Sequence, residues 1–391
     1  MADASRHKLS AVLESSYGVT PVSPVFESVR HTELSLGLSK NTQISEELKE
    51  NRQIQDFKHG AKQVGGDLGF ELSYGTYDAF FEAVLLSDSG WNTIAPINDT
   101  TFSVDDSDGS FNDSGNGFLA AGFKPGDKFT SAGFTTGANN STFEIKSVVA
   151  GKIVVIDATG LVTEAAGDSV TFTVTSANIV AGVTRRSFSV LREFSDFQVA
   201  DKPFHLFNGV EYNNMTLTIT ADAKVTGTFT TLGRDQEPTS ETEPAGSTYN
   251  AATTTKVMDS FTGTISEGGV VNGVVTELTL NMENGLEPRF VVGSDKTILP
   301  TVGRSNLSGN LTAYFENSDL LDKFINEDES TLDLTLVDAD GNSYHITMPR
   351  VKYNAGQPDV SGQGAITLAM PFQALYDADL DTNVIFTRIA A

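Results

Sequence analysis

The sequence predicts a mainly β protein that contains two tandem copies of one β module, with a further small β domain inserted in the first copy. The chain has 35 Gly and 25 Phe, the latter spread through short runs with Thr and Val, a composition typical of strands and turns. Its 391 residues exceed the ~250–300 at which single cores divide into domains. Several segments also recur in the same order, as in a repeat.

The first recurring segment is a strand. The sequence reads TELSLGL around Leu34 and TELTLNM around Leu278, at an offset of 244 residues (277 − 33). Apolar and polar residues alternate in both, which places Leu34 with Leu36, and Leu278 with Leu280, on one face of a strand.

The second recurring segment is a strand followed by a short helix. GGDLGFELSYGTYDAFFEAVL (65–85) matches SGNLTAYFENSDLLDKFI (308–325), with Phe80 aligned to Leu321 at an offset of 241 (321 − 80). Apolar residues four apart, such as Phe80 and Val84, predict a helix that packs one face on the sheet.

The third recurring segment is Val-x-Tyr-Asn, at 210–213 and again at 351–354, with an offset of only 141 (353 − 212). The drop from 241 to 141 places about 100 extra residues in the first copy. These residues, 92–183, form short alternating stretches separated by Gly, Asn and Pro-Gly. They predict a small independent β domain, Ig-like or a small barrel, on the outside of the main body.

The remaining segments complete the predicted organisation. Pro21 and Pro24 favour an extended arm at the N-terminus, and the Thr- and Ser-rich stretch after the first copy is typical of a linker or exposed loop. The predicted parts are the arm (1–31), a first domain in two pieces (32–91 and 184–233), the inserted domain (92–183), the linker (234–260) and a second domain (261–391).

Charge excludes one class of partner. Asp and Glu number 51 against 26 Lys and Arg, a net charge of −25, and no Lys/Arg-rich run occurs. Tight binding to nucleic acid is therefore not expected, whereas an acidic surface suits solubility or a passage from which DNA is repelled. The absence of Cys excludes disulfides and thiolate metal sites. No signal peptide or membrane-spanning segment is expected.

No feature of the sequence predicts catalysis, so neither an enzyme nor a cofactor is expected. The esterase elbow G-x-S-x-G and the phosphate-binding G-x-x-x-x-G-K-[ST] are both missing. The histidines are dispersed without metal-ligand spacing; they are His7, His31, His59, His205 and His345.

The acidic stretch 104–117 leaves two readings open. Its carboxylates could hold calcium, but their spacing does not match the D-x-[DN]-x-[DN]-G loop, which favours a solvated turn and no metal. The carboxylates concerned are those of Asp105, Asp106, Asp108 and Asp113.

Two long polar segments occupy equivalent places in the two copies, at 40–63 and 283–305. Loops of this length are either functional or simply solvated, and their recurrence favours contacts with other subunits. The candidate contact residues are Ile44, Leu48, Arg52, Ile54, Phe57, Lys58, His59, Arg289, Phe290 and Ile298.

Taken in order, several stretches resemble tail tube proteins (major tail proteins) of long non-contractile-tailed bacteriophages, the siphophages. They include ESSYGVTPVSPVFESVRHTELSLGLSKN, RQIQDFKHGAKQVGGDLGFELSYGTYDAFFEAVL, FNGVEYNNMTLTITADAKVTGTFTTLG and VSGQGAITLAMPFQALYD. The resemblance covers most of the chain outside 92–183. The inserted domain is similar to the small β decoration domains that some of these proteins carry.

The resemblance implies two tail-tube-type domains, each with two packed sheets and a flanking helix, in which one sheet curves into a β barrel around a lumen. Rings in the family usually contain six such domains, so three chains would close a pseudo-sixfold ring; a homohexamer is the alternative. Closing a sheet into a ring removes its unpaired edges. On this reading segments 40–63 and 283–305 bridge to the next ring, and the arm straps a neighbour.

The same resemblance implies location and partners. The protein would be made in the host cytoplasm and reside in the virion tail, as a conduit for DNA during ejection. DNA and the tape measure protein would occupy the lumen without specific binding, and tail terminator and distal tail proteins would contact the ends. Alternatives are a surface-binding or adhesin module, and the tube of a phage-derived secretion system or defective phage particle.

Overall fold

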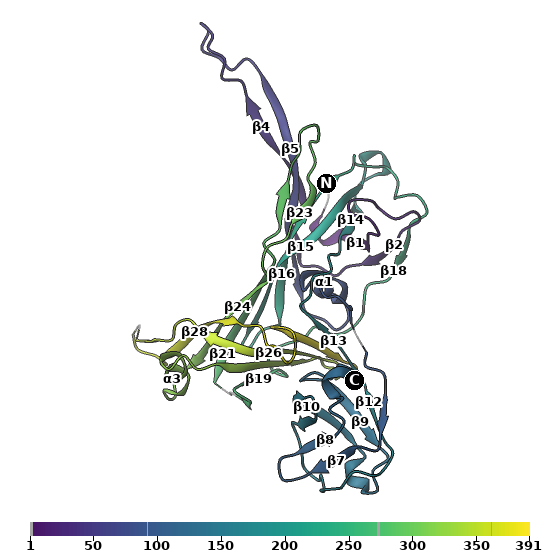
Figure 1. The fold of residues 1–391 in the computed structure, drawn as a ribbon. Coiled ribbons are helices and arrows are strands. Elements are labelled where there is room, and N and C mark those ends of the chain that lie inside the picture. Colours follow the sequence, from purple (N-terminus) through teal and green to yellow (C-terminus); the bar gives the residue numbers. More distant parts are fainter. Residues whose placement is uncertain (1–2, 92, 272–273, 361) are drawn as a thin grey trace.

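The structure, a computed structural model, describes residues 3–91, 93–271, 274–360 and 362–391. Asn92, where the predicted insert begins, lies outside the described residues. The protein is mainly β, as predicted. A large sheet assembly of twenty strands forms the main body, and a separate seven-stranded sheet forms a small domain at one end (Figure 1). In the described part of the single chain, no sheet closes into a barrel.

The first unit contains strands from both sides of the insert and one helix. Its elements are β1 (His7–Leu13), β2 (Val25–Ser28), β3 (Glu33–Leu34), β4 (Gly37–Ile44), β5 (Phe57–Glu71), α1 (Asp78–Val84), β14 (Phe188–Phe194), β15 (Phe204–Thr220), β16 (Thr226–Gly233), β17 (Asp235–Gln236) and β18 (Thr248–Asn250). Short 3-10 turns occur at Ala4–Arg6, Gly137–Asn139 and Val199–Asp201.

The second unit repeats this plan with shorter connections. Its elements are β19 (Thr264–Glu267), β20 (Val270–Val271), β21 (Val275–Glu283), β22 (Glu287–Arg289), β23 (Ile298–Thr301), β24 (Asn306–Tyr314), α3 (Asp319–Ile325), β25 (Ser330–Val337), β26 (Ser343–Tyr353), β27 (Pro358–Asp359), β28 (Thr367–Ala374) and β29 (Ile385–Ile389).

The two units share the register of their strands, so the repeat seen in the sequence is a repeat of structure. Leu34 pairs with Leu68 as Leu278 pairs with Leu311. Tyr212 on β15 pairs with Thr231, and Tyr353 on β26 pairs with Phe372. Each residue of the second pair lies 141 positions after its counterpart in the first pair, which is the offset of the Val-x-Tyr-Asn motif.

A β-bulge also recurs at the Asn of that motif. The β15–β16 register shifts between Tyr212 and Asn214. Between Tyr353 and Pro358 the pairing with β28 shifts by one residue in the same way. A bulge re-aims the residue that forms it, so this motif marks a place where each strand turns toward a neighbour.

The N-terminal segment differs from the extended arm that the sequence predicts. Residues 7–13 form β1, which pairs along its whole length with β14 of the same chain. β1 flanks β14 as β19 flanks β25 in the second unit, so this segment is an integral strand of the first unit. The predicted linker is also partly structured, because β18 pairs in parallel with β2.

The inserted domain is a seven-stranded antiparallel sheet with a short helix, and its core is rich in phenylalanine. Its elements are β6 (Ile97–Asp99), β7 (Phe102–Asp105), β8 (Ser110–Asp113), α2 (Phe118–Ala121), β9 (Lys128–Ala132), β10 (Thr142–Val149), β11 (Lys152–Val155) and β12 (Val170–Val174). Strand β13 (Ser176–Val180), within the predicted insert range, belongs instead to the main body, where it pairs with β29.

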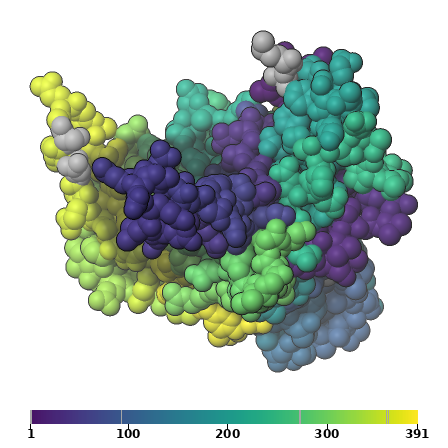
Figure 2. Space-filling view, turned by 90° about the horizontal axis from the view of Figure 1, so that it is seen from above, coloured from purple at the N-terminus to yellow at the C-terminus, as the bar shows by residue number. Residues whose placement is uncertain are grey.

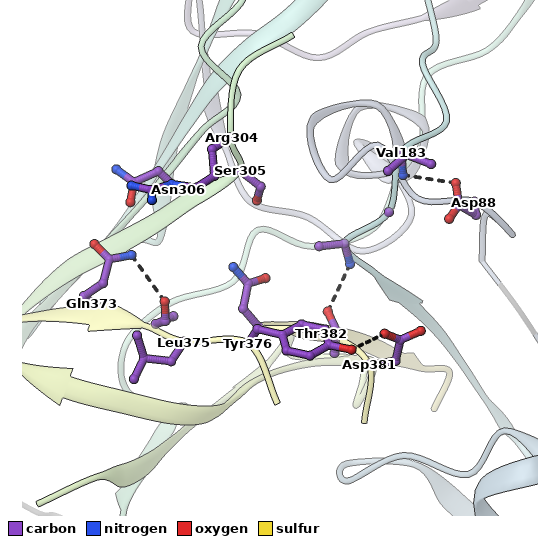
Figure 3. Close-up of a pocket in the computed structure, with 14 residues that line it drawn as sticks. Asp88, Val183, Arg304, Ser305, Asn306, Gln373, Leu375, Tyr376, Asp381 and Thr382 are labelled. Atoms are coloured by element: carbon purple, nitrogen blue, oxygen red, sulfur yellow. Dashed lines mark hydrogen bonds between the residues drawn. The ribbon is translucent and has the colours of Figure 1, made fainter. Parts of the chain in front are cut away.

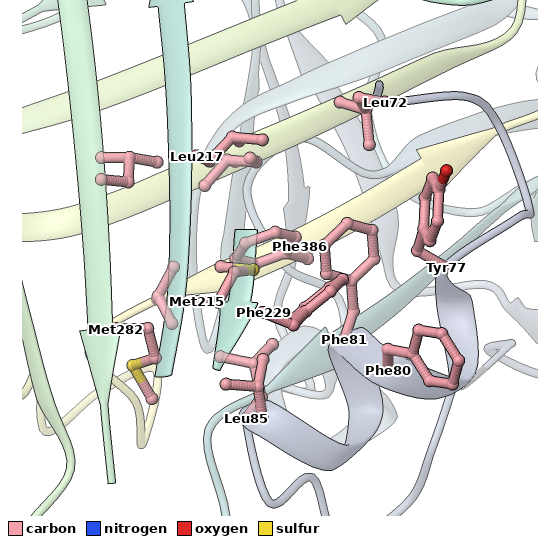
Figure 4. Packing of buried hydrophobic residues seen from close by; sticks show 14 of the residues in the cluster. Leu72, Tyr77, Phe80, Phe81, Leu85, Met215, Leu217, Phe229, Met282 and Phe386 are labelled. Atoms are coloured by element: carbon pink, nitrogen blue, oxygen red, sulfur yellow. The ribbon is translucent and has the colours of Figure 1, made fainter. Parts of the chain in front are cut away.

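The main hydrophobic core lies between the sheet and α1. Phe80 and Phe81 of the helix contact Phe229 of β16, and Phe81 also contacts Phe386 of β29 (Figure 4). Leu217 on β15 and Leu280 on β21 are buried in the same core. The strands therefore bury one face on the helix side and leave the opposite face free.

Candidate assembly surfaces

The two units are joined by direct strand pairing, which we call the internal interface. The second half of β15 pairs antiparallel with β21 from Asn214 opposite Glu283 to Thr220 opposite Glu277. The N–H of Ala221 donates to the carbonyl of Thr276 at 2.9 Å. Because hydrogen-bonded pairs alternate along such a ladder, Leu217 and Leu280 also form a hydrogen-bonded pair.

Helix α1 forms a second layer of the internal interface. Tyr344 of the second unit donates its hydroxyl to Asp78 at 2.5 Å and accepts the N–H of Gly75 at 2.9 Å. Burial raises the pKa of Tyr344, so the phenol keeps the proton that it donates. Arg388 forms an ion pair with the same Asp78. The helix is therefore covered by the following unit.

The connection between β21 and β24, hairpin 2 (residues 284–305), lies over the first unit. The N–H of Asn284 donates to the carbonyl of Asn213 at 2.9 Å, and the N–H of Leu286 donates to the Asn213 side chain at 2.6 Å. Asn213 is the bulge residue, so the bulge holds the base of this hairpin.

The distal part of hairpin 2 is also attached. The N–H of Lys62 donates to the carbonyl of Asp295 at 2.7 Å, and the ammonium of Lys62 lies 3.0 Å from the carboxylate of that residue. The hydrogen bond to Asp295 raises the pKa of Lys62, and Lys296 pairs with Asp235. Arg185 donates to the carbonyl of Pro300 at 2.7 Å.

Hairpin 1 (residues 40–62), the counterpart in the first unit, projects from the body (Figure 1). β4 and β5 remain paired up to Ile44 opposite Phe57. From above, hairpin 1 lies between the yellow strands of the second unit and the green segment of hairpin 2, with the inserted domain at the periphery (Figure 2).

All ten predicted contact residues are exposed on the two hairpins. Leu48 is 99 % exposed at the tip of hairpin 1, and the ring of Phe57 contacts His59 edge to face at 5.1 Å. In hairpin 2, Arg289 donates to the carbonyl of Leu299. The structure brings seven of the ten together on hairpin 1 and three on hairpin 2. Whether they contact another subunit stays a prediction.

The sheet assembly has unpaired edges at both ends. The β3–β4 edge occupies the place that β21 has in the second unit, and β27 occupies the place of the second half of β15. At one edge the carbonyl of Leu36 accepts a hydrogen bond from Arg192 at 2.5 Å. At the other edge stands Pro358, which has no N–H to donate.

Two grooves border the second unit at places equivalent to those that hairpin 2 covers on the first unit. The proximal groove, about 580 Å³, is bordered by α3 and the Val-x-Tyr-Asn segment, including Ile325 and Asn354. The distal groove, about 700 Å³, is bordered by Ser305, Tyr376 and the carboxylates of Asp88 and Asp381 (Figure 3). It is also lined by residues 181–183, which, like Asp88, lie outside the second unit. Tyr376 donates its hydroxyl to Asp381 at 2.5 Å.

The face of the sheet opposite α1 is polar, and along β5, β15, β16, β21 and β24 the strand positions that alternate with the core carry no Lys or Arg. On β26 one such position is Lys352, opposite Gln373 of β28. Thr230 donates to Asp67 at 2.7 Å, and Thr216 to Asn281 at 3.3 Å, on this face. Its members are Asp67, Glu71, Asn214, Thr216, Thr218, Thr226, Thr228, Thr230, Glu277, Thr279, Asn281, Glu283, Ser308, Asn310 and Thr312. We call it the polar face.

The acidic stretch 104–117 does not gather its carboxylates around one point. Asp113 accepts hydrogen bonds from Thr101 and from the N–H groups of Gly115 and Gly117. These hydrogen bonds lower the pKa of Asp113 against the opposing effect of burial. Asp108 forms an ion pair with Lys152. Across the described residues, no group of three or more metal-ligating side chains is present.

Sequence reasoning missed the roles of four residues of these surfaces. Asn213 and Asn354 were noticed as part of a repeated motif, yet their role as bulge residues depends on strand register. Arg192 carried no local signal, because its partner Leu36 is 156 positions away. Pro358 lies in no segment that the sequence predicts as a strand, so the edge signal that a proline gives inside a strand did not identify it.

Unpaired sheet edges, a face rich in hydroxyl, amide and carboxylate groups, and a projecting hairpin 1 are features of a β-rich structural subunit. A family model described as phage tail tube protein matches residues 4–374. The chain therefore belongs to the phage tail tube protein family, which is structural, self-assembles into a tube and resides in the virion tail. A comparison of this sequence with curated proteins found no match. No helix in the described ranges is long and apolar enough to cross a membrane.

Proposed function

We propose that chains join head to tail through their free edges into a closed ring, and that stacked rings form a conduit for DNA. The internal interface supports this, because the second unit ends in the same edge that the first unit uses to bind the second. If the joint between two chains has the register of the internal interface, it pairs residues 355–357 of one chain with residues 37–39 of the next. Ala355, Gly356 and Gln357 then lie opposite Ser39, Leu38 and Gly37.

The two edges have complementary hydrogen-bonding groups at Pro358 and Leu36. In the internal interface Leu217 faces Leu280 as a hydrogen-bonded pair, and the equivalent residues between chains are Pro358 and Leu36. Pro358 cannot donate, while the carbonyl of Leu36 already accepts from Arg192. Neither side leaves an unsatisfied group at this position, which a misplaced register would create.

Three chains supply six units, so a trimer with pseudo-sixfold symmetry follows if every unit joins the barrel; a hexamer of chains follows if one unit of each chain does not. The polar face would then line the lumen. Hydroxyl and amide groups with a few carboxylates, and no cations at these strand positions, would repel DNA phosphates rather than hold them.

The hairpins would connect successive rings. Hairpin 1 exposes Ile44, Leu48 and Ile54, and apolar side chains gathered on a projecting segment are typical of contact surfaces. On this proposal DNA passes the lumen during ejection, with a tape measure protein inside and other tail proteins at the ends.

Electron microscopy of the purified protein tests the ring. Hollow rings or tubes with threefold or sixfold symmetry are expected. Lys40→Pro should abolish rings, because Lys40 lies where Asn284 donates its N–H across the internal interface, and proline removes that donor. Lys40→Ala is the matched control and should still form rings. Rings from both variants would contradict the proposal.

A second variant tests stacking. Replacing residues 44–57 by an Asn-Gly turn shortens hairpin 1 while a tight hairpin still joins β4 to β5. Rings without tubes are expected; tubes of normal length would show that the tip of hairpin 1 does not connect rings.

A further inference from the structure

The second unit has an open surface where the first unit has a covered one. Val84 of α1 is 0 % exposed, whereas Ile325, at the same place in α3, is 61 % exposed. Asp235 is 8 % exposed beneath hairpin 2, and its equivalent Tyr376 is 57 % exposed. Both exposed residues border the proximal or distal groove.

Equivalent positions connect each groove to a specific attachment point of hairpin 2. Asn354 corresponds to Asn213, whose side chain and carbonyl hold the base of that hairpin. Ser305 corresponds to Lys62, which binds Asp295. The two grooves therefore stand at the two ends of a binding surface that is occupied in the first unit and vacant in the second.

We propose that hairpin 1 of a second copy of this chain docks in these two grooves, across the ring joint. The inference rests on the proposed ring, and deepens it by naming the surface that receives the hairpin. Hairpin 1 spans residues 40–62 and hairpin 2 spans 284–305, which are nearly equal lengths. Both shift register beyond their bases, hairpin 1 by one residue and hairpin 2 in two steps of one residue.

The proximal contacts follow from the internal interface. Asn284 and Leu286 correspond to Lys40 and Thr42. The N–H of Lys40 then donates to the carbonyl of Asn354, and the N–H of Thr42 donates to its side chain. Asn354 is exposed in the single chain, and docking would satisfy this polar side chain as Asn213 is satisfied now.

The distal contacts are set by charge. Counted from β5 and β24, whose offset is 243 (305 − 62), Lys62 corresponds to Ser305, and its partner Asp295 corresponds to Arg52 (295 − 243), one of the predicted contact residues. Arg52 therefore reaches the distal groove, whose wall carries the carboxylates of Asp88 and Asp381. The groove is also lined by Arg304, so its two carboxylates outnumber its one cation. A cation in the hairpin would then face a groove with an acidic excess, the reverse of the arrangement in the first unit.

Docking leaves the apolar tip residues free for the next ring. Hairpin 2, although attached to the first unit, still exposes Phe290, Val291 and Val292. A docked hairpin 1 would likewise retain exposed apolar side chains, so lateral docking and contact with a stacked ring use different faces of the same hairpin.

Cysteine cross-linking tests the docking, and the chain has no Cys of its own. In the double variant R52C/S305C, oxidation should join different chains into covalent dimers and trimers. We expect about tenfold more multimer than in either single variant, because docking holds the two thiols at a high effective concentration. Peptide mass spectrometry should identify the 52–305 bond.

Two further pairs complete the design. K62C/D295C is the positive control and should cross-link within one chain, without covalent multimers. Q53C/Y376C probes an adjacent pair of equivalent positions, in case either substitution in the first pair disturbs folding. Rings under the microscope with no cross-link from either interchain pair would overturn the docking and leave the ring intact; a protein that forms no rings would overturn the proposed function itself.

Discussion

The first and second units share strand order, register and a bulge, yet their helices have opposite environments. α1 buries Phe80, Phe81, Ala83 and Val84, whereas α3 buries none of its residues. The difference comes from what lies next to each helix. α1 is covered by Tyr344 and Phe386 of the second unit, while in the described residues α3 packs Leu320 and Phe324 partly against the core and leaves Ile325 exposed. An internal repeat therefore shows which surfaces a neighbouring chain can complete.

The strands at the two joints differ in the same way. β15 is one continuous strand of 17 residues that pairs with β14 in its first half and with β21 in its second half. Its counterpart is broken into β26 and β27, with Pro358 in the second piece. The joint that must form during folding has a continuous strand. The joint proposed to form during assembly has an edge blunted by proline, a feature that limits pairing with wrong partners.

The largest effect is expected from the buried helix. Phe81→Ala should lower the free energy of unfolding by about 3–5 kcal/mol, because it removes a buried aromatic ring and leaves a cavity. The exposed counterpart Asp322→Ala should change it by less than about 0.5 kcal/mol. Urea unfolding in the Lys40→Pro background, where rings are blocked, measures the protomer alone. Equal costs at both positions would contradict the contrast between the helices.

A pair of smaller substitutions at equivalent positions of α1 and α3 tests the same contrast between the two helices. Val84→Ala should cost about 1–3 kcal/mol in protomer stability from lost methyl burial and a residual cavity. Ile325→Ala should be neutral in the protomer and should instead raise the concentration needed for ring formation. Sedimentation velocity reports ring formation, and an Ile325→Ala protein that assembles at the same concentration as the parent would show that α3 stays uncovered.

The two bulge residues offer a third comparison. Asn213→Ala should destabilise the protomer by about 1 kcal/mol, because the N–H of Leu286 loses its acceptor. Asn354→Ala should leave protomer unfolding unchanged and weaken rings by about fivefold for a similar loss at each joint. The readouts are urea unfolding and sedimentation; protomer destabilisation by Asn354→Ala would place that side chain in an intrachain role.

The smallest effect is an acid sensitivity confined to the first unit. Burial, helped by Arg192, lowers the pKa of His7 to about 4, and the neighbouring rings of His31 and His205 have pKa values lowered in the same direction. Gly263 takes the place of His7 beside β25, so the second unit has no matching group.

The direction of the pH dependence of stability follows from the protons that the folded and unfolded states bind. Between pH 6.5 and 4 the unfolded state protonates His7 while the folded state keeps it neutral, so stability falls as pH decreases through this window. Because His7 is partly exposed, the loss is about 1 kcal/mol after allowing for solvent screening. His7→Asn should flatten the decline of the protomer melting temperature between pH 7 and 5; an unchanged slope would show that His7 does not contribute.

Much of the fold was predictable because its signals are local. Alternation around Leu34 and Leu278 indicated strands, and Phe80 with Val84 indicated a helix, since these periods depend only on neighbouring residues. The place of β1 was not predictable in this way. Its partner β14 lies about 180 residues away, and Pro21 and Pro24 between β1 and the next strands suggested an arm. Likewise β13 followed the inserted domain in sequence but paired with β29.

The candidate surfaces were predictable in part for the same reason. Exposed apolar residues on long polar loops, such as Leu48 and Ile54, can be recognised from composition. The roles of Asn354, Pro358 and Arg192 require knowing which backbone groups face outward, and that depends on register across strands distant in sequence.

The sequence alone determined the repeat, the strand and helix periods, the acidic balance and the recurrence of Val-x-Tyr-Asn, because each is fixed by residue order or composition. Only the tertiary structure decided which equivalent surfaces are covered, which edges remain unpaired and where hairpin 2 attaches. Whether a surface is covered depends on which distant segment of the chain reaches it. Structurally equivalent segments of the two units therefore have different environments, because only the first unit is followed by another unit in the same chain.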